Sequence, residues 1–161
     1  MDSLLHTDEE EEASESKLSR QAVWFFVHTI LALGAWIALM LAGYALNPAG
    51  VPQIAILALS IAVPLVVGLI VTRIRQDEIA ASVWLIGLIW ILIISLWVLD
   101  MPTGPNACFQ CGAMEKITRT FFSLPSASGL IDNDGPFLGT WPAAALIGYS
   151  IGAKLGLRKH D

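Results

Sequence analysis

Charged side chains are scarce in this 161-residue sequence: Asp, Glu, Lys and Arg supply 14% of the residues, whereas hydrophobic residues supply 55%. This composition excludes an ordinary soluble domain, because lipid must surround most of the chain. Half of the fourteen acids lie near the N-terminus, at Asp2, Asp8, Glu9, Glu10, Glu11, Glu12 and Glu15. The remainder is slightly basic, and nothing in it supports a nucleic-acid partner.

Residues that carry out chemistry are also scarce. The sequence has no Gly-rich phosphate loop and no His-Glu-x-x-His pair. Apart from His28, no acid or base lies deep within an apolar stretch, which argues against an ion pump, a proton-coupled transporter or a voltage sensor. The N-terminus also lacks a basic start followed directly by a short apolar run, so we do not expect a cleaved signal peptide.

Four apolar stretches dominate what is present, and they cover about residues 22–46, 51–72, 79–99 and 137–157. At 1.5 Å per residue, each can cross a hydrocarbon core of roughly 30 Å. The short connections between the first three predict antiparallel neighbours. We therefore predict an all-α integral membrane protein: an antiparallel four-transmembrane-helix bundle over 21–161, with an acidic solvated tail at 1–20 and an outer loop at 100–136.

Basic residues predict the orientation of this bundle. One side carries Lys17, Arg20, Arg73, Arg75, Lys154, Arg158 and Lys159, whereas the other has Lys116 and Arg119, both within the outer loop. Basic residues are retained on the cytoplasmic side of membranes. We therefore expect both termini in the cytoplasm, with a bacterial inner membrane as the location.

The outer loop contains one segment with helical periodicity, Met114–Leu124, in which apolar and charged residues alternate as they do in a short interfacial helix. After it come two turn-rich segments and then Thr140, a residue type that often caps helices. We expect the amphipathic segment to lie on the membrane surface or against a partner. We also expect Thr140 to cap the fourth helix.

Small residues recur at every fourth position on two of the predicted helices. The ladder on the fourth helix consists of Ala144, Gly148, Gly152 and Gly156, and the ladder on the first consists of Gly34, Ala38 and Ala42. Helices associate in lipid by close backbone approach, which small residues permit. Both ladders are predicted packing faces. Either both serve the bundle itself, or one of them docks on another subunit.

The two cysteines, Cys108 and Cys111, form a Cys-x-x-Cys pair in the outer loop. In a periplasm such a pair can hold an exchangeable disulfide. The four-helix plan with this pair is similar to that of the bacterial membrane oxidoreductases that pass disulfides to quinone, and of the vitamin K epoxide reductases. Those families use a second cysteine pair, which this chain lacks. We favour a simple loop disulfide, with a membrane thiol-disulfide oxidoreductase as the alternative. Zinc would need two more ligands, and no His lies in this loop, so a metal site within this chain is not predicted; a metal shared with a partner subunit is the alternative.

His28 lies about six residues, or roughly 9 Å, inside the first predicted helix. An ionisable residue at that depth is a functional candidate, and a neutral imidazole there can contact a (bacterio)chlorophyll, a haem or a quinone. The alternative, which we favour, is a neutral His bonded to a backbone group or hydroxyl of a neighbouring helix.

The lack of catalytic residues and the number of close-packing faces together favour a non-catalytic role. We expect an accessory subunit that packs with other membrane subunits and lipid inside a larger complex. Respiratory and photosynthetic complexes contain small helical subunits of this general kind. In such a setting His28 would lie near a pigment, haem or quinone.

Overall fold

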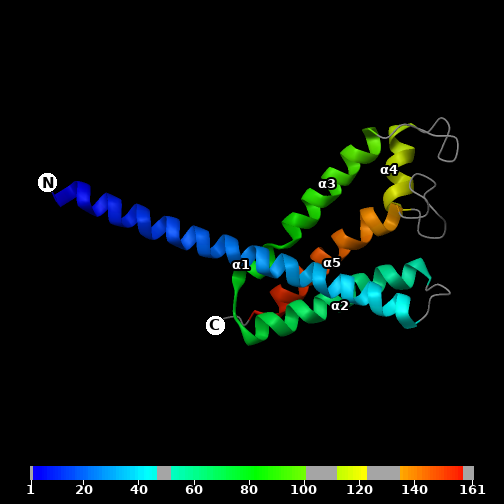
Figure 1. Cartoon of the computed structure of the whole chain (residues 1–161), viewed down its shortest axis with the longest axis horizontal. Coiled ribbons are helices and arrows are strands. Elements are labelled where there is room, and N and C mark those ends of the chain that lie inside the picture. Colours follow the sequence, from blue (N-terminus) through cyan, green and yellow to red (C-terminus); the bar gives the residue numbers. More distant parts are fainter. Residues whose placement is uncertain (1, 47–51, 101–111, 123–134, 158–161) are drawn as a thin grey trace.

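The computed structural model is all-α and describes residues 2–46, 52–100, 112–122 and 135–157. Within these residues it contains five α-helices and one 3₁₀ helix (Figure 1). In chain order they are α1 (Asp2–Leu46), α2 (Gln53–Ile74), η1 (Glu78–Ser82), α3 (Trp84–Asp100), α4 (Ala113–Phe122) and α5 (Gly135–Gly156).

Three of these helices are long and apolar enough to cross a membrane, over Lys17–Leu46, Ile54–Ile74 and Glu78–Asp100. They indicate an integral membrane protein. The fourth predicted span corresponds to α5, which is not among the three in the described residues. The reason is compositional, since α5 contains glycines, two prolines and several hydroxyl residues in place of large aliphatic ones. A membrane crossing by α5 stays a prediction.

Helix α1 is longer than the sequence pattern predicted. It runs for 45 residues from Asp2, whereas we expected a separate solvated tail over 1–20 and a helix only from about residue 22. The helical continuation through these residues was not predicted, and a solvated acidic tail stays a prediction. Glu, Ala, Leu and Lys are strong helix formers, and acids near a helix N-terminus interact favourably with its dipole. Extending an existing helix costs far less than nucleating one.

The closest helix pair is α2 with α5, which run parallel. A Cβ added to Gly148 would meet the carbonyl oxygen of Ile61, and one added to Gly152 would meet that of Leu65. One turn further along α5, a Cβ on Gly156 would lie 2.7 Å from the carbonyl oxygen of Leu69. Only glycine permits this approach. The predicted ladder on α5, with Ala144 also buried, therefore packs within the chain.

Helix α1 lies against α2, α5 and η1, whereas α3 packs on α5 and α4. Two buried contacts fix α1 and α5 as antiparallel: His28 meets Tyr149, and two turns further along α1, Trp36 clusters with Trp141 near the start of α5. Figure 1 shows α5 among the other helices of the bundle. Helix α5 is thus the core element, and its smallest residues face its nearest neighbour.

Helix α4 closes one end of the bundle, where the amphipathic pattern predicted a short helix. Its Phe121 is buried, and Gly139 leaves the space that this ring fills, because a Cβ there would lie 3.1 Å from the ring. Thr140 was predicted to cap α5 but lies inside that helix, and its hydroxyl donates to the carbonyl oxygen of Phe121 at 2.7 Å. Thr140 therefore ties α5 to α4.

The third predicted helix begins later than expected. Instead of an α-helix from residue 79, the chain forms the 3₁₀ helix η1 and then α3 from Trp84. Asp77 explains the change, because its carboxylate accepts a hydrogen bond from the backbone N–H of Ile79 at 3.4 Å. This cap starts a tight turn before the long helix can form.

Candidate functional site

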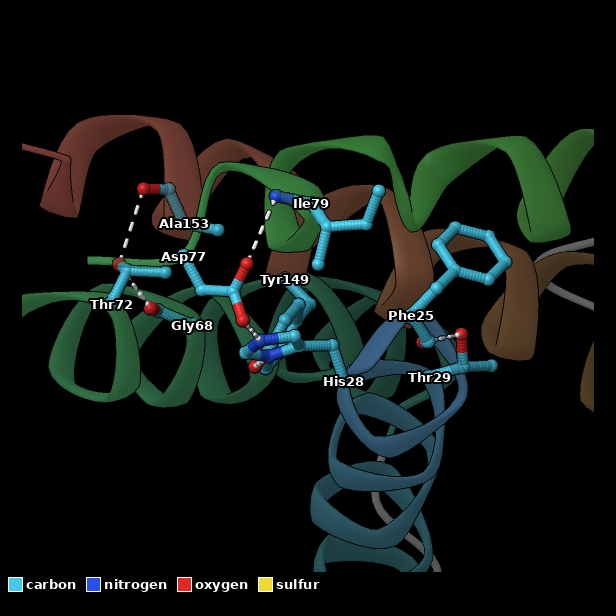
Figure 2. Close-up of polar contacts among 9 residues, drawn as sticks. All are labelled: Phe25, His28, Thr29, Gly68, Thr72, Asp77, Ile79, Tyr149 and Ala153. Carbon is cyan, nitrogen blue, oxygen red and sulfur yellow. Dashed lines mark hydrogen bonds and ion pairs between the residues drawn. The ribbon is translucent and has the colours of Figure 1, made fainter. Parts of the chain in front are cut away.

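His28 is the centre of a buried polar cluster that joins three elements. It is 1% exposed and lies on the inward face of α1. Its Nδ1 atom is 2.7 Å from the hydroxyl of Tyr149 on α5, and its Nε2 atom is 3.5 Å from Oδ2 of Asp77, just before η1 (Figure 2). The depth of His28 in an apolar stretch had singled it out, but neither Tyr149 nor Asp77 was predicted as its partner.

One tautomer of His28 suits the positions of Tyr149 and Asp77. If the Tyr149 hydroxyl donates to Nδ1, the proton of the neutral ring is on Nε2 and faces the Asp77 carboxylate. At 3.5 Å that second contact is longer than a good N–H···O hydrogen bond, and Nε2 has no hydrogen-bond partner among the described groups. The Tyr149 bond is therefore the stronger of the two, and the Asp77 contact is mainly electrostatic.

Asp77 has a second task that limits its position. Its other carboxylate oxygen, Oδ1, accepts the N–H of Ile79 and so caps η1. One oxygen thus holds the turn while the other faces His28, as Figure 2 shows. The same residue that shortens α3 therefore supplies the charge beside the buried imidazole.

Aromatic rings cover this cluster on the side of α1. The ring centroids of Trp24 and His28 are 6.3 Å apart, and those of His28 and Tyr149 are 5.9 Å apart. The guanidinium carbon of Arg75 lies 3.4 Å from the centroid of the Trp24 ring, which is cation–π geometry. The cluster therefore lies beneath a basic and aromatic layer at the end of the bundle that carries Lys17 and Arg73.

Thr72 forms a second polar link beside this cluster, between α2 and α5. Its hydroxyl is buried and lies 2.7 Å from the carbonyl oxygen of Gly68 and 3.1 Å from that of Ala153 (Figure 2). Gln76 in turn donates to the carbonyl oxygen of Thr72 at 3.0 Å. The bond from Thr72 to Ala153 holds the ends of α2 and α5 together, shortly before the chain reaches Asp77.

The geometry gives His28 a structural task within the chain. Its bond to a hydroxyl on a neighbouring helix is the arrangement that the sequence favoured over ligand binding. To bind His28, a haem iron, a pigment magnesium or a quinone carbonyl would have to displace Tyr149 or enter beside Asp77. The cofactor contact stays a prediction. Among the described residues, no group of three His, Cys, Asp or Glu side chains is placed to hold a metal ion.

Residues 148–152 have the sequence Gly-Tyr-Ser-Ile-Gly, which matches the Gly-x-Ser-x-Gly motif of the hydrolase nucleophile elbow. That elbow requires a sharp turn from a strand into a helix, whereas this segment lies inside α5. Its two glycines face α2. Ser150 is 4% exposed, and its hydroxyl has no hydrogen-bond partner among the described groups, so no base of the described residues lies in contact with it. The segment is a packing motif.

The two predicted ladders have different surroundings. The α5 ladder is covered by α2, but Gly34, Ala38 and Ala42 on α1 are exposed, and nothing lies within 4 Å of a Cβ added to Gly34. This exposed row on α1 is called the α1 stripe below. Cys108 and Cys111 lie outside the described residues, so the loop disulfide and the redox pair both stay predictions.

Sequence reasoning missed Asp77, Tyr149 and Thr72. A signal existed for Tyr149, which is one of two tyrosines in the chain and the one deep in an apolar helix. Asp77 had appeared only as part of a polar connection.

Comparison with known proteins adds no further assignment, since the chain matches no protein-family model, no curated protein and no solved structure.

Proposed function

We propose that this chain is a non-catalytic accessory subunit of a larger membrane complex, an energy-transducing one of the respiratory or photosynthetic kind. The observation that carries the proposal is the exposure of the α1 stripe. This row of small residues, Gly34, Ala38 and Ala42, is exposed on a membrane helix, and no other described part of the chain covers it.

The α5 ladder supports this interpretation of the α1 stripe. On α5, glycines at the same spacing bring the α2 backbone into direct contact. Flexible lipid chains pack poorly against a row of small residues such as the α1 stripe. A second helix, in contrast, makes close van der Waals contact along it, which stabilises the pair. The α1 stripe therefore suits a helix from another subunit. Large apolar side chains border it, among them Ile37 and Leu41, and both are exposed.

The length of α1 gives separate support. About fifteen residues precede Lys17, where the apolar span begins, and at 1.5 Å per residue they extend roughly 22 Å beyond it. Figure 1 shows this N-terminal part projecting away from the other helices. It carries the acidic run Asp8–Glu12. A projecting acidic helix suits contact with a basic surface of a neighbouring subunit.

The proposal includes the four-span bundle, with α5 as the fourth span and both termini in the cytoplasm of a bacterial cell. Helix α5 lies parallel to α2 and beside it, so a membrane that contains α2 also contains most of α5. Lys17, Arg73 and Lys154 then lie at one end of the bundle, and Lys116 at the other. This distribution follows the positive-inside rule.

The test replaces small residues of the α1 stripe with leucine. Affinity purification of the tagged Gly34→Leu/Ala38→Leu protein in mild detergent should recover it without its partner subunits, whereas the wild-type chain should bring them in fixed proportion. The matched control is Ala62→Leu, the same enlargement at an exposed position on α2. Full recovery of partners with the double variant would refute the proposal.

A further inference from the structure

A groove lies on the face of α5 that is turned away from α1. It has a volume of about 570 Å³ and runs between the last turns of α5, the 3₁₀ helix η1 and the start of α3. None of His28, Asp77 and Tyr149 lines it, so this groove is separate from the buried cluster.

The groove carries one acid and one base at its polar end. Glu78 comes from η1 and Lys154 from α5, and both are exposed. They form no ion pair with each other, so both charges are available to a ligand. One turn before Lys154 lies Ser150, 4% exposed and with its hydroxyl unpartnered among the described groups. A buried hydroxyl without a partner is costly, which points to a polar group from outside the chain.

The remainder of the groove is apolar. Trp84, Ile147 and Ile151 line this apolar part. The same two isoleucines border a second groove of about 490 Å³ that continues along α5 toward α4 and Thr140. From Lys154 to Thr140 the helix rises roughly 21 Å, which exceeds the roughly 15 Å depth of one acyl-chain layer. A charged end therefore leads into an apolar path long enough for an acyl chain.

We propose that this groove binds a phospholipid with a phosphoethanolamine headgroup. The phosphate lies at Lys154, the primary ammonium lies at Glu78, and one acyl chain follows Ile147 and Ile151 along α5. The Trp84 ring lies at the level of the headgroups, as amphipathic rings do at membrane interfaces. The pairing of one acid with one base matches a zwitterionic headgroup.

The chemistry distinguishes this lipid from its two common relatives. A phosphoglycerol headgroup has a phosphate for Lys154 but no cation for Glu78. With this lipid bound, the Glu78 carboxylate would have no positively charged partner in the headgroup. A phosphocholine headgroup has a cation, but its quaternary nitrogen has no N–H to donate to the Glu78 carboxylate. The site therefore selects for a primary ammonium.

Native mass spectrometry of the full-length protein tests the proposal. The protein is mixed in mild detergent with equal amounts of phosphatidylethanolamine, phosphatidylglycerol and phosphatidylcholine that carry identical acyl chains. We expect phosphatidylethanolamine to be the main bound lipid. Glu78→Gln should lower that preference roughly two- to five-fold, the effect of removing one interfacial ion pair. Lys154→Gln should instead lower the binding of all three lipids by a similar factor, because each of them carries the phosphate. Arg73→Gln, which removes a nearby charge outside the groove, should leave the preference and the binding unchanged.

Two further measurements complete the test. Ile151→Trp fills the apolar part of the groove and leaves both charges in place, so it should lower the binding of all three lipids. Circular dichroism checks that the helix content is unchanged. Soluble glycerophosphoethanolamine should not displace the bound lipid, because it lacks the acyl chains. Equal binding of the three lipids, unchanged selectivity in Glu78→Gln, or displacement by the soluble headgroup would each overturn the proposal.

Discussion

The Nδ1 atom of His28 and the hydroxyl of Tyr149 lie 2.7 Å apart, although 121 positions separate the two residues in the chain. The bond joins α1 to α5 in a region where lipid offers no alternative hydrogen-bond partner. It also fixes the rotation of α1 about its own axis. With His28 turned inward, Gly34 and Ala38 are turned outward. The buried bond and the exposed stripe are therefore two consequences of one helix orientation.

The first prediction concerns this bond. Tyr149→Phe keeps the ring and removes the hydroxyl, so the buried Nδ1 atom loses its partner. We expect the free energy of unfolding to fall by about 1 kcal/mol, the usual size for an interhelical hydrogen bond. Unfolding by SDS in mixed micelles, followed by circular dichroism, measures the change. Tyr44→Phe is the matched control, because Tyr44 is 78% exposed.

A double-mutant cycle separates this bond from general packing. The cycle combines Tyr149→Phe with His28→Leu, and we expect a coupling energy of about 0.5–1.5 kcal/mol. Strictly additive effects would show that the two side chains are neighbours without a bond. An absorption spectrum of the wild-type complex belongs to the same experiment, since pigment or haem bands that disappear in His28→Leu would assign a cofactor contact to this residue.

The second prediction compares glycines from the two ladders. A Cβ at Gly152 would lie 2.7 Å from the carbonyl carbon of Leu65, whereas a Cβ at Gly34 would meet nothing within 4 Å. Gly152→Ala should therefore force α2 and α5 apart and lower the free energy of unfolding by about 1–3 kcal/mol. Gly34→Ala should be neutral or slightly stabilising. The same unfolding assay checks both variants.

An equal loss of stability in the two alanine variants would contradict the assignment of the ladders. The pair also clarifies the test of the proposed function. Enlarging Gly152 damages the subunit itself, so a lost partner would have two explanations. Enlarging Gly34 leaves the fold intact, so the loss of a partner from that variant has a single explanation, a blocked contact at the α1 stripe.

Hydropathy and length were sufficient to predict the spans that became α1, α2 and α3, because a membrane-spanning helix needs only a long apolar run. The same measures also predicted a span over 137–157, but α5 is not among the three long apolar helices of the described residues. Helix α2 packs closely on one face of this helix, which requires small residues such as Gly148 and Gly152, and they lower its hydropathy. The spacing of those residues, rather than their hydropathy, predicted the packing face.

The candidate site was predictable only in part. The depth of His28 in an apolar stretch marked it from the sequence. Its partners depend on how α1 and α5 are rotated against each other and on where the chain turns at Asp77. Both follow from side-chain packing across more than a hundred residues, which a single sequence does not encode locally. The 3₁₀ turn at η1 was missed for the same reason.

The third prediction concerns Thr72. Thr72→Val keeps the shape and removes the hydroxyl that lies 3.1 Å from the carbonyl oxygen of Ala153, so the link between α2 and α5 is lost. We expect a loss of about 1 kcal/mol in the free energy of unfolding. Thr118→Val is the matched control, because the exposed Thr118 hydroxyl bonds, among the described residues, within its own helix, to the carbonyl oxygen of Met114 at 2.8 Å. Similar losses in both variants would contradict the role of Thr72 as a link between helices.

The last prediction separates two roles of basic residues at one end of the bundle. Arg73 and Arg75 count equally in the positive-inside rule, yet only Arg75 has a ring contact in the described structure, 3.4 Å above Trp24. Arg75→Gln should therefore lower the free energy of unfolding by about 0.5–1 kcal/mol, whereas Arg73→Gln should not. In Trp24→Leu the further change Arg75→Gln should cost nothing, because the ring is already gone. If Arg75→Gln is as costly without the ring as with it, the charge acts at the membrane surface and the contact with Trp24 contributes no stability.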